Sequence, residues 1–321
     1  MISRNKVFTI LLLFILPATI FPQQSESRIS ITVLDENDNF LTDLKLPDIQ
    51  FLEEKQALPI SAIELKNASS LEVVIMIDAS ASQEKTLPVE KQVAEYLIDN
   101  ILKKEKDRVG IVKFSGTLLL EQNLTNDFAL AKRRLDTIQF VPPTDYTPGG
   151  IVINKTPSTK NTGGFREGAT SIWDSVRQVA ESLAKLQTDN SRRVIIVISD
   201  GINTYGETKL NEAIEFSLKK QIPIFSIGIG DEFYGGVDKE VLNNLSEQTG
   251  GISIFPNKKL DNLSKIMKRL EQSLRSFYQI TFVPKENKLK KNSREIKIEI
   301  VKPQLRKRKL QIFPRKIYFL P

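Results

Sequence analysis

Two nearly continuous apolar runs constrain the fold of this chain more than any other feature. Residues 71–77 read LEVVIMI and residues 194–198 read VIIVI, and each run is followed by a polar loop and then by a helical pattern. A strand that is apolar on both sides has to be buried on both faces, which is typical of a parallel sheet covered by helices. The sequence therefore predicts an α/β fold with a doubly wound, mostly parallel sheet.

The same alternation of strand and helix continues through the middle of the chain. Further strands are expected at residues 109–114, 118–121, 222–227 and 252–255. Apolar residues spaced by threes and fours predict helices at residues 89–104, 127–135, 172–186, 209–219, 239–248 and 260–274. Together these segments define one α/β domain over residues 69–276.

The two flanks of this domain have a different pattern. Residues 25–68 and 277–321 contain short runs in which apolar and polar residues alternate, bounded by Asp, Asn and Pro, as in antiparallel strands. Each flank has only about three such strands and must bury one apolar face, so neither suffices alone. We expect them to pair into one small, sandwich-like β domain into which the α/β domain is inserted.

The junction between the two domains contains no flexible linker. The helix expected at residues 260–274 runs into Phe277 and Tyr278 without an intervening Gly or Pro. Such a helix either transmits an axial shift to the β domain or packs statically and only connects the two.

The first residues have the pattern of a targeting signal. Arg4 and Lys6 precede an apolar run at residues 7–16, which Pro17 and Ala18 close. This is typical of a secretory signal peptide, here residues 1–24, whereas the alternative, a membrane anchor, needs about 20 apolar residues. We therefore expect an exported protein without a membrane span after signal removal. The lack of Cys favours a bacterial envelope: periplasm, cell surface or secreted.

Composition and missing motifs argue against an enzyme. The chain has no His and no Cys, which excludes Ser-His-Asp triads, histidine bases, Cys nucleophiles and most transition-metal catalytic sites. A phosphate-binding G-x-x-x-x-G-K-[ST] loop is missing, and Gly228-Ile-Gly230 continues into Asp-Glu-Phe, so the dinucleotide fingerprint fails. Asp78 lacks the second Asp that an aspartyl-phosphate phosphatase needs.

Oxygen-bearing side chains follow the buried strands. Asp78, Ser80 and Ser82 come after the first strand, Asp200 follows the second, and Thr170 precedes the helix expected at residues 172–186. The carboxyl ends of parallel strands meet at one sheet edge, and ligands that are all oxygen suit Mg²⁺, Mn²⁺ or Ca²⁺. Two carboxylates and neutral hydroxyls leave such an ion able to accept a carboxylate from another molecule. The alternative is ordinary turn and helix-cap composition.

Six ordered segments resemble the von Willebrand factor type A (VWFA) domain family over about residues 70–275. They read VVIMIDASAS, DRVGIVKFSG, GATSIWDSV, RRVIIVISDGINT, IPIFSIGIG and LSEQTGG. The resemblance implies a doubly wound fold with a metal-ion-dependent adhesion site (MIDAS). In that site Ser80, Ser82 and Thr170 would be direct ligands, while Asp78 and Asp200 would act closely or through water. The flanks resemble those of bacterial exported "VWFA-related" proteins.

One segment departs from the family pattern. The segment at residues 142–167 is long and rich in Gly, Pro and Thr. A loop of this kind beside Thr170 is expected to be mobile and to gate or shape the ligand face.

These observations predict an exported adhesion or protein–protein interaction module. It would hold Mg²⁺ (or Mn²⁺) and bind a protein ligand that presents Asp or Glu. The alternative is a structural or scaffolding envelope protein whose metal site is vestigial or internally satisfied. Basic runs at residues 288–291 and 302–309 indicate either attraction to an anionic envelope surface or the solvated face of an edge strand; export argues against nucleic acid. Trp173 is expected to pack beneath the Thr170 loop.

Overall fold

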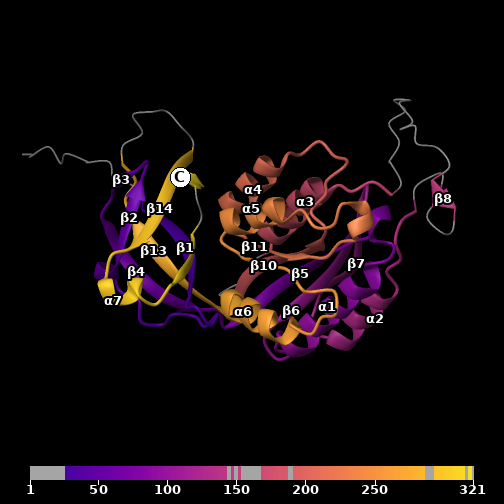
Figure 1. Ribbon diagram of the computed structural model, residues 1–321, viewed down its shortest axis with the longest axis horizontal. Coiled ribbons are helices and arrows are strands. Elements are labelled where there is room, and N and C mark those ends of the chain that lie inside the picture. The colour runs from indigo at the N-terminus through magenta and orange to yellow at the C-terminus, as the bar shows by residue number, and fades with distance from the viewer. Residues whose placement is uncertain are drawn as a thin grey trace, which may run out of the picture.

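A computed structural model describes residues 26–142, 146–147, 151–152, 168–186, 191–285, 293–314 and 317–319. Figure 1 shows two lobes side by side, an all-β lobe and an α/β lobe. The signal peptide expected at residues 1–24, the basic run at 288–291 and most of the segment 142–167 lie outside the described residues. From that last segment the structure gives a short hairpin of β8 (Tyr146–Thr147) and β9 (Ile151–Val152).

A six-stranded sheet forms the centre of the α/β lobe, in the order β12-β11-β10-β5-β6-β7. Neighbouring strands are parallel except that β7 runs antiparallel to β6 at one edge. The strands are β5 (Ser70–Asp78), β6 (Arg108–Phe114), β7 (Leu118–Thr125), β10 (Ser191–Ser199), β11 (Ile224–Gly228) and β12 (Ser253–Ile254).

Helices cover both faces of this sheet (Figure 1). One face packs against α1 (Leu87–Asn100), α2 (Phe128–Asp136) and α6 (Leu263–Arg275), and the other against α3 (Ile172–Ala184), α4 (Leu210–Lys219) and α5 (Lys239–Thr249). In β5, Val73 and Ile75 enter the first core while Val74 and Met76 enter the second. The predicted two-sided burial and the doubly wound α/β fold are therefore confirmed. Trp173 is 7 % exposed and packs in the second core.

The β lobe is a sandwich of two antiparallel four-stranded sheets with a shared apolar core. The first sheet has the order β15-β1-β13-β4 and the second β16-β14-β2-β3. Its strands from the amino-terminal flank are β1 (Ser27–Leu34), β2 (Ile49–Glu53), β3 (Gln56–Ala57) and β4 (Ile60–Asn67). Those from the carboxyl-terminal flank are β13 (Ser276–Phe282), β14 (Ser293–Ile300), β15 (Gln311–Pro314) and β16 (Ile317–Phe319). Strands from the two ends of the chain thus lie hydrogen-bonded in both sheets.

The basic run at residues 302–309 differs from the strand-like alternative given above. It contains a short helix, α7 (Pro303–Arg306), because Pro303 stands at the first turn, where its fixed φ and missing N–H suit a helix rather than a strand ladder. Lys302 Nζ lies 3.0 Å from Asp48 Oδ1, and Arg306 Nε donates to the Ile300 carbonyl at 2.7 Å. Part of the positive charge of this run therefore contacts acceptors within the β lobe itself.

The junction between the lobes is tightly bonded. Helix α6 ends at Arg275 and β13 begins at Ser276. Arg275 Nη2 lies 2.6 Å from Oδ2 of the buried Asp107. Arg192 donates to the last carbonyls of α6 and lies over the Phe277 ring, 4.2 Å from its centroid.

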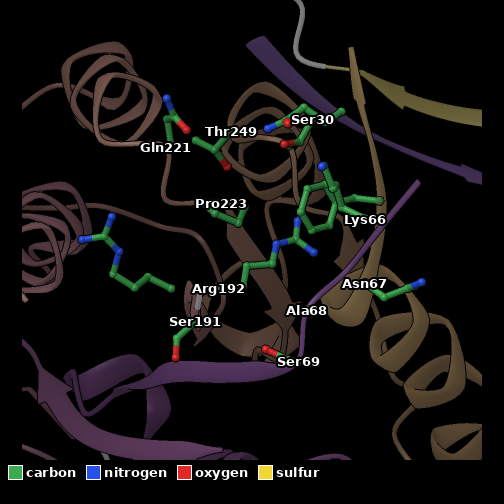
Figure 2. A pocket seen from close by; sticks show the side chains of 14 residues that line it. Ser30, Lys66, Asn67, Ala68, Ser69, Ser191, Arg192, Gln221, Pro223 and Thr249 are labelled. Atoms are coloured by element: carbon green, nitrogen blue, oxygen red, sulfur yellow. The ribbon is translucent and has the colours of Figure 1, made fainter. Parts of the chain in front are cut away.

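A polar cleft of about 670 Å³ lies at this junction (Figure 2). Side chains from both lobes line it, among them Lys66 and Asn67 from β4, Arg192 from β10, and Gln221. The cleft lies at the amino-terminal edge of the parallel sheet, away from the edge where the strands end.

Candidate metal centre

Each predicted site residue lies at the carboxyl-terminal edge of the sheet. Asp78 is the last residue of β5, and Ser80 and Ser82 follow in a loop that contains the 3₁₀ turn η2 (Ala81–Gln83). Asp200 follows β10, and Thr170 lies two residues before α3. Ser82 is partly exposed and the other four are buried. The parallel pairing of β5 and β10 explains why loops far apart in the sequence meet here.

Three of the oxygens have the spacing that a hard cation needs. Ser80 Oγ and Ser82 Oγ are 3.2 Å apart, and Ser82 Oγ donates to Asp200 Oδ2 at 2.9 Å. An octahedral Mg²⁺ with ligands at about 2.1 Å holds adjacent ligand oxygens about 3 Å apart. The Ser80–Ser82 and Ser82–Asp200 separations are therefore those expected of adjacent ligands of such an ion.

Thr170 is brought to the same edge through its loop. The Gly168 carbonyl accepts from Ala81 N at 3.1 Å, which fastens the loop before Thr170 to the loop of Ser80 and Ser82. On the other side, Thr170 N donates to Thr204 Oγ1 at 2.9 Å, and its carbonyl accepts from the backbone N–H groups of Thr204 and Tyr205. The three loops of the predicted site are thus bonded to one another.

The two carboxylates are held by protein donors. Asp78 Oδ1 accepts from Ser80 N at 3.0 Å, and Asp78 Oδ2 accepts from Ser199 Oγ at 2.6 Å. Burial, reinforced by the negative charge of Asp200, raises the pKa of Asp78 to about 7. Burial also raises the pKa of Asp200. Two carboxylates buried together cost free energy that a bound cation would offset.

Gln83 contacts the site but was not predicted from the sequence. Its buried side chain donates from Nε2 to Asp200 Oδ2 at 2.7 Å, so it competes for the oxygen that Ser82 contacts. Thr86 Oγ1 donates in turn to Gln83 Oε1. A polar residue directly after the D-x-S-x-S motif was the only sequence signal for this role.

Glu90 is a second residue that the sequence analysis missed. It is fully buried on α1, and within the described part of the chain neither carboxylate oxygen has a hydrogen-bond partner. Burial raises its pKa well above the usual value, and the charges of Asp78 and Asp200 add to this effect. Its place three residues from both Leu87 and Val93, on the buried helix face, was the available signal.

The chemistry of the donors decides which ligands an ion would use. Among the residues that the structure describes, no three Asp or Glu side chains cluster so that they could hold a metal ion. An ion at this edge would therefore depend on the hydroxyls of Ser80, Ser82 and Thr170 beside two carboxylates.

A family model matches most of the α/β lobe. The model of the von Willebrand factor type A domain matches residues 72–269. The chain belongs to this family. The resemblance stated from the sequence is confirmed, and with it the expected fold.

Solved structures of similar proteins were also found. The conserved hypothetical protein BatB from Bacteroides thetaiotaomicron is 22 % identical, with a TM-score of 0.46, over 63 % of this chain and 97 % of its own. An aerotolerance-related membrane protein from Bacteroides fragilis NCTC 9343 is 20 % identical, with a TM-score of 0.44, over 63 % and 99 %. Proximal thread matrix protein 1 from the mussel byssus, described with a zinc-occupied MIDAS motif, is 16 % identical, with a TM-score of 0.45, over 65 % and 49 %. No curated protein was found to match.

Membership of the family indicates the general role of the domain. Domains of this family commonly mediate protein–protein interaction and are generally not enzymes. Within the described residues, no helix has the length and apolar character to cross a bilayer. The bound metal, the roles of the five residues and export remain predictions.

Proposed function

We propose that this protein is an exported module that binds a partner protein through a metal ion held by Asp78, Ser80, Ser82, Thr170 and Asp200. The ion would be Mg²⁺ or Mn²⁺. It would act as a positive centre that attracts an Asp or Glu carboxylate of the partner. The spacing of Ser80 Oγ, Ser82 Oγ and Asp200 Oδ2 is the observation that carries this proposal.

Charge supports the same conclusion. Only two carboxylates, Asp78 and Asp200, neutralise the ion in this ligand set, and both can be held partly by other donors. Neutral hydroxyls add no negative charge, so the ion keeps an affinity for one more anion. A buried cluster of three carboxylates would have satisfied it internally.

Thermal unfolding with and without metal tests the proposal. We expect millimolar Mg²⁺ or Mn²⁺ to raise the unfolding midpoint and EDTA to lower it, because an ion that binds only the folded chain adds about 2.7 kcal/mol at a hundredfold excess over Kd. Asp78→Ala should abolish this response. Asp99→Ala, which removes an exposed carboxylate on α1, is the matched control and should keep it. Equal midpoints in metal and EDTA for the wild type would contradict the proposal.

Gln83 favours a second candidate, a scaffolding protein whose site is satisfied internally. Its amide already donates to Asp200 Oδ2. In that case the wild type would not respond to metal, and Gln83→Met, which removes the donor, would create a response. A response already present in the wild type excludes this candidate.

The proposed partner is a protein rather than a nucleic acid or an anionic surface. In the basic run at residues 302–309, Lys302, Arg308 and Lys309 each lie within 4 Å of an acidic side chain. This pairing lowers the field that the run offers to a polyanion.

Export is tested separately. The mature amino terminus, determined by mass spectrometry on protein from the envelope fraction, should fall between residues 18 and 25. Recovery of an intact residue 1 would contradict export by a cleaved signal.

A further inference from the structure

Exposed aromatic side chains lie in two loops at the sheet edge that carries the candidate metal centre. In the part of the chain whose side chains are described, three aromatic residues are at least 36 % exposed: Phe233 (75 %), Tyr234 (37 %) and Tyr205 (36 %). All three lie in the two loops that follow β10 and β11. Large apolar side chains exposed to solvent, particularly when several lie close together, are typical of a surface that binds another molecule.

The loop that carries Phe233 and Tyr234 lies directly against Asp200. A Cβ added at Gly230 would come within 2.9 Å of the Asp200 Cβ, and Asp238 N donates to the Asp200 carbonyl at 2.8 Å. On the other side, Lys85, three residues after Ser82, lies 3.5 Å from Asp231 and 5.4 Å from the centroid of the Phe233 ring. The aromatic pair is therefore connected to two of the three loops that supply the candidate ligands, those of Asp200 and Ser82.

Local bonds hold the pair in place without a partner. The two residues stand in the 3₁₀ turn η3 (Glu232–Tyr234), where Phe233 N donates to Asp231 Oδ1 at 3.1 Å. Gly235, at φ 104°, ends this turn in a conformation that favours glycine. The Phe233 and Tyr234 rings meet edge to face with centroids 5.1 Å apart. An aromatic surface that is already ordered loses little entropy on binding, which makes it effective in recognition.

We propose that Phe233 and Tyr234 form an apolar subsite beside the metal centre, so that the partner is a protein segment with an acidic side chain next to a large apolar or aromatic one. The acidic side chain would reach the ion and the apolar one would cover the Phe233 ring. This proposal rests on the proposed function above and gives the metal centre its sequence preference.

Selection from a displayed library of random 12-residue peptides tests the subsite. The full chain is immobilised in Mg²⁺ and bound peptides are eluted with EDTA. We expect the eluted peptides to be enriched in Asp or Glu adjacent to an apolar or aromatic residue. Synthetic versions should bind Phe233→Ser about tenfold more weakly than the wild type, the loss typical of an anchor aromatic. Leu120→Ser, which changes an equally exposed apolar residue on β7, should bind them like the wild type.

The outcomes separate the subsite from the metal centre. Acidic peptides without apolar neighbours that bind Phe233→Ser and wild type equally would overturn the subsite and leave the proposed function standing. Peptides that bind through aromatic contacts and resist EDTA would overturn both. A library that yields no peptide eluted by EDTA would likewise reject both.

Discussion

Asp78 links the candidate metal centre to pH. Its pKa in the folded chain is raised to about 7, chiefly by burial, against an ordinary value of 3.8. A group with a raised pKa favours folding fully below its unfolded pKa, and this contribution is lost as the pH rises through the folded pKa. The metal-free chain should therefore lose stability, through Asp78, between about pH 4 and pH 7.

Urea unfolding in EDTA measures this effect as the difference between wild type and Asp78→Asn. We expect the unfolding free energy of Asp78→Asn to rise relative to that of the wild type as the pH rises across that window. Mg²⁺ binding requires the ionised carboxylate, so its apparent affinity should fall about tenfold for each pH unit below about 7. A difference that does not vary with pH would contradict the assignment.

Glu90 gives a second prediction for a single residue. A buried carboxylate without a hydrogen-bond partner costs free energy, and the cost grows when it ionises. Its pKa is raised, so its contribution to stability is also present at low pH and lost as the pH rises. Glu90→Gln should be more stable than the wild type at pH 8, by about 1–3 kcal/mol. The exposed Glu105→Gln is the control in the same urea series. A variant less stable than the wild type at every pH would show that Glu90 has a polar partner.

The residues of the candidate site were only partly predictable from the sequence. Asp78, Ser80 and Asp200 follow apolar strands directly, so strand order alone places them at one edge. Gln83 and Glu90 were missed because an amphipathic pattern counts polar residues as exposed. Gln83 is buried by its contact with Asp200, and Glu90 by the packing of α1 on the sheet; both are tertiary contacts.

At the scale of elements, the ion pair between Asp107 and Arg275, which connects α6 to the sheet, can be tested directly. Asp107 is fully buried, accepts from Leu71 N and Lys103 N, and pairs with Arg275 at the end of α6. Removal of one partner of a buried ion pair leaves the other charge uncompensated, at a cost of about 3–5 kcal/mol. Asp107→Ala should lower the unfolding free energy by that amount.

The exposed pair of Asp99 and Lys132 is the control for this substitution. Its atoms are 2.8 Å apart, a normal distance for an ion pair, but the Lys132 and Asp99 side chains are 33 % and 49 % exposed, against 13 % and 0 % for Arg275 and Asp107. Asp99→Ala should therefore cost under about 1 kcal/mol. Equal losses for Asp99→Ala and Asp107→Ala in chemical unfolding would show that the buried pair does not stabilise the junction.

Sequence periodicity predicted the helices and strands more accurately than it predicted their first and last residues. The apolar stripe predicted for the last helix is buried in α6 at Leu263, Met267, Leu270 and Leu274. The helix begins at Leu263 rather than at residue 260, because Leu260 has φ 55°, in the left-handed region. The edge strand β7 extends to Thr125, beyond the expected residue 121, since pairing with β6 continues past the apolar residues. Pairing partners and single φ values are tertiary properties that a pattern in one segment does not contain.

At the scale of the whole molecule, strand pairing bears on the predicted insertion of one domain into another. Within the described residues, β1 pairs with β13 and β15, and β4 pairs with β13, so both depend on the carboxyl-terminal flank. In the part of the chain that the structure describes, the amino-terminal flank pairs with itself through the short β2–β3 ladder and the isolated bridge between Leu34 and Phe40, and the carboxyl-terminal flank through β14 and β16. A two-stranded ribbon is marginal in water.

Separate expression of three pieces tests the predicted division. Residues 26–68 and 276–321 should each be unfolded by circular dichroism and proton NMR, because neither can complete a sheet. Residues 69–275 should fold, since the six-stranded sheet and both helical layers lie within them. This piece should be less stable than the same lobe in the full chain, because Arg192 loses Phe277 and the end of α6 loses its continuation into β13. If residues 26–68 fold alone, the β lobe is not shared between the two ends of the chain and the predicted insertion is wrong. If residues 69–275 match the full chain in urea unfolding, the contacts of α6 with the β sandwich do not stabilise the α/β lobe, and α6 packs as a static connection.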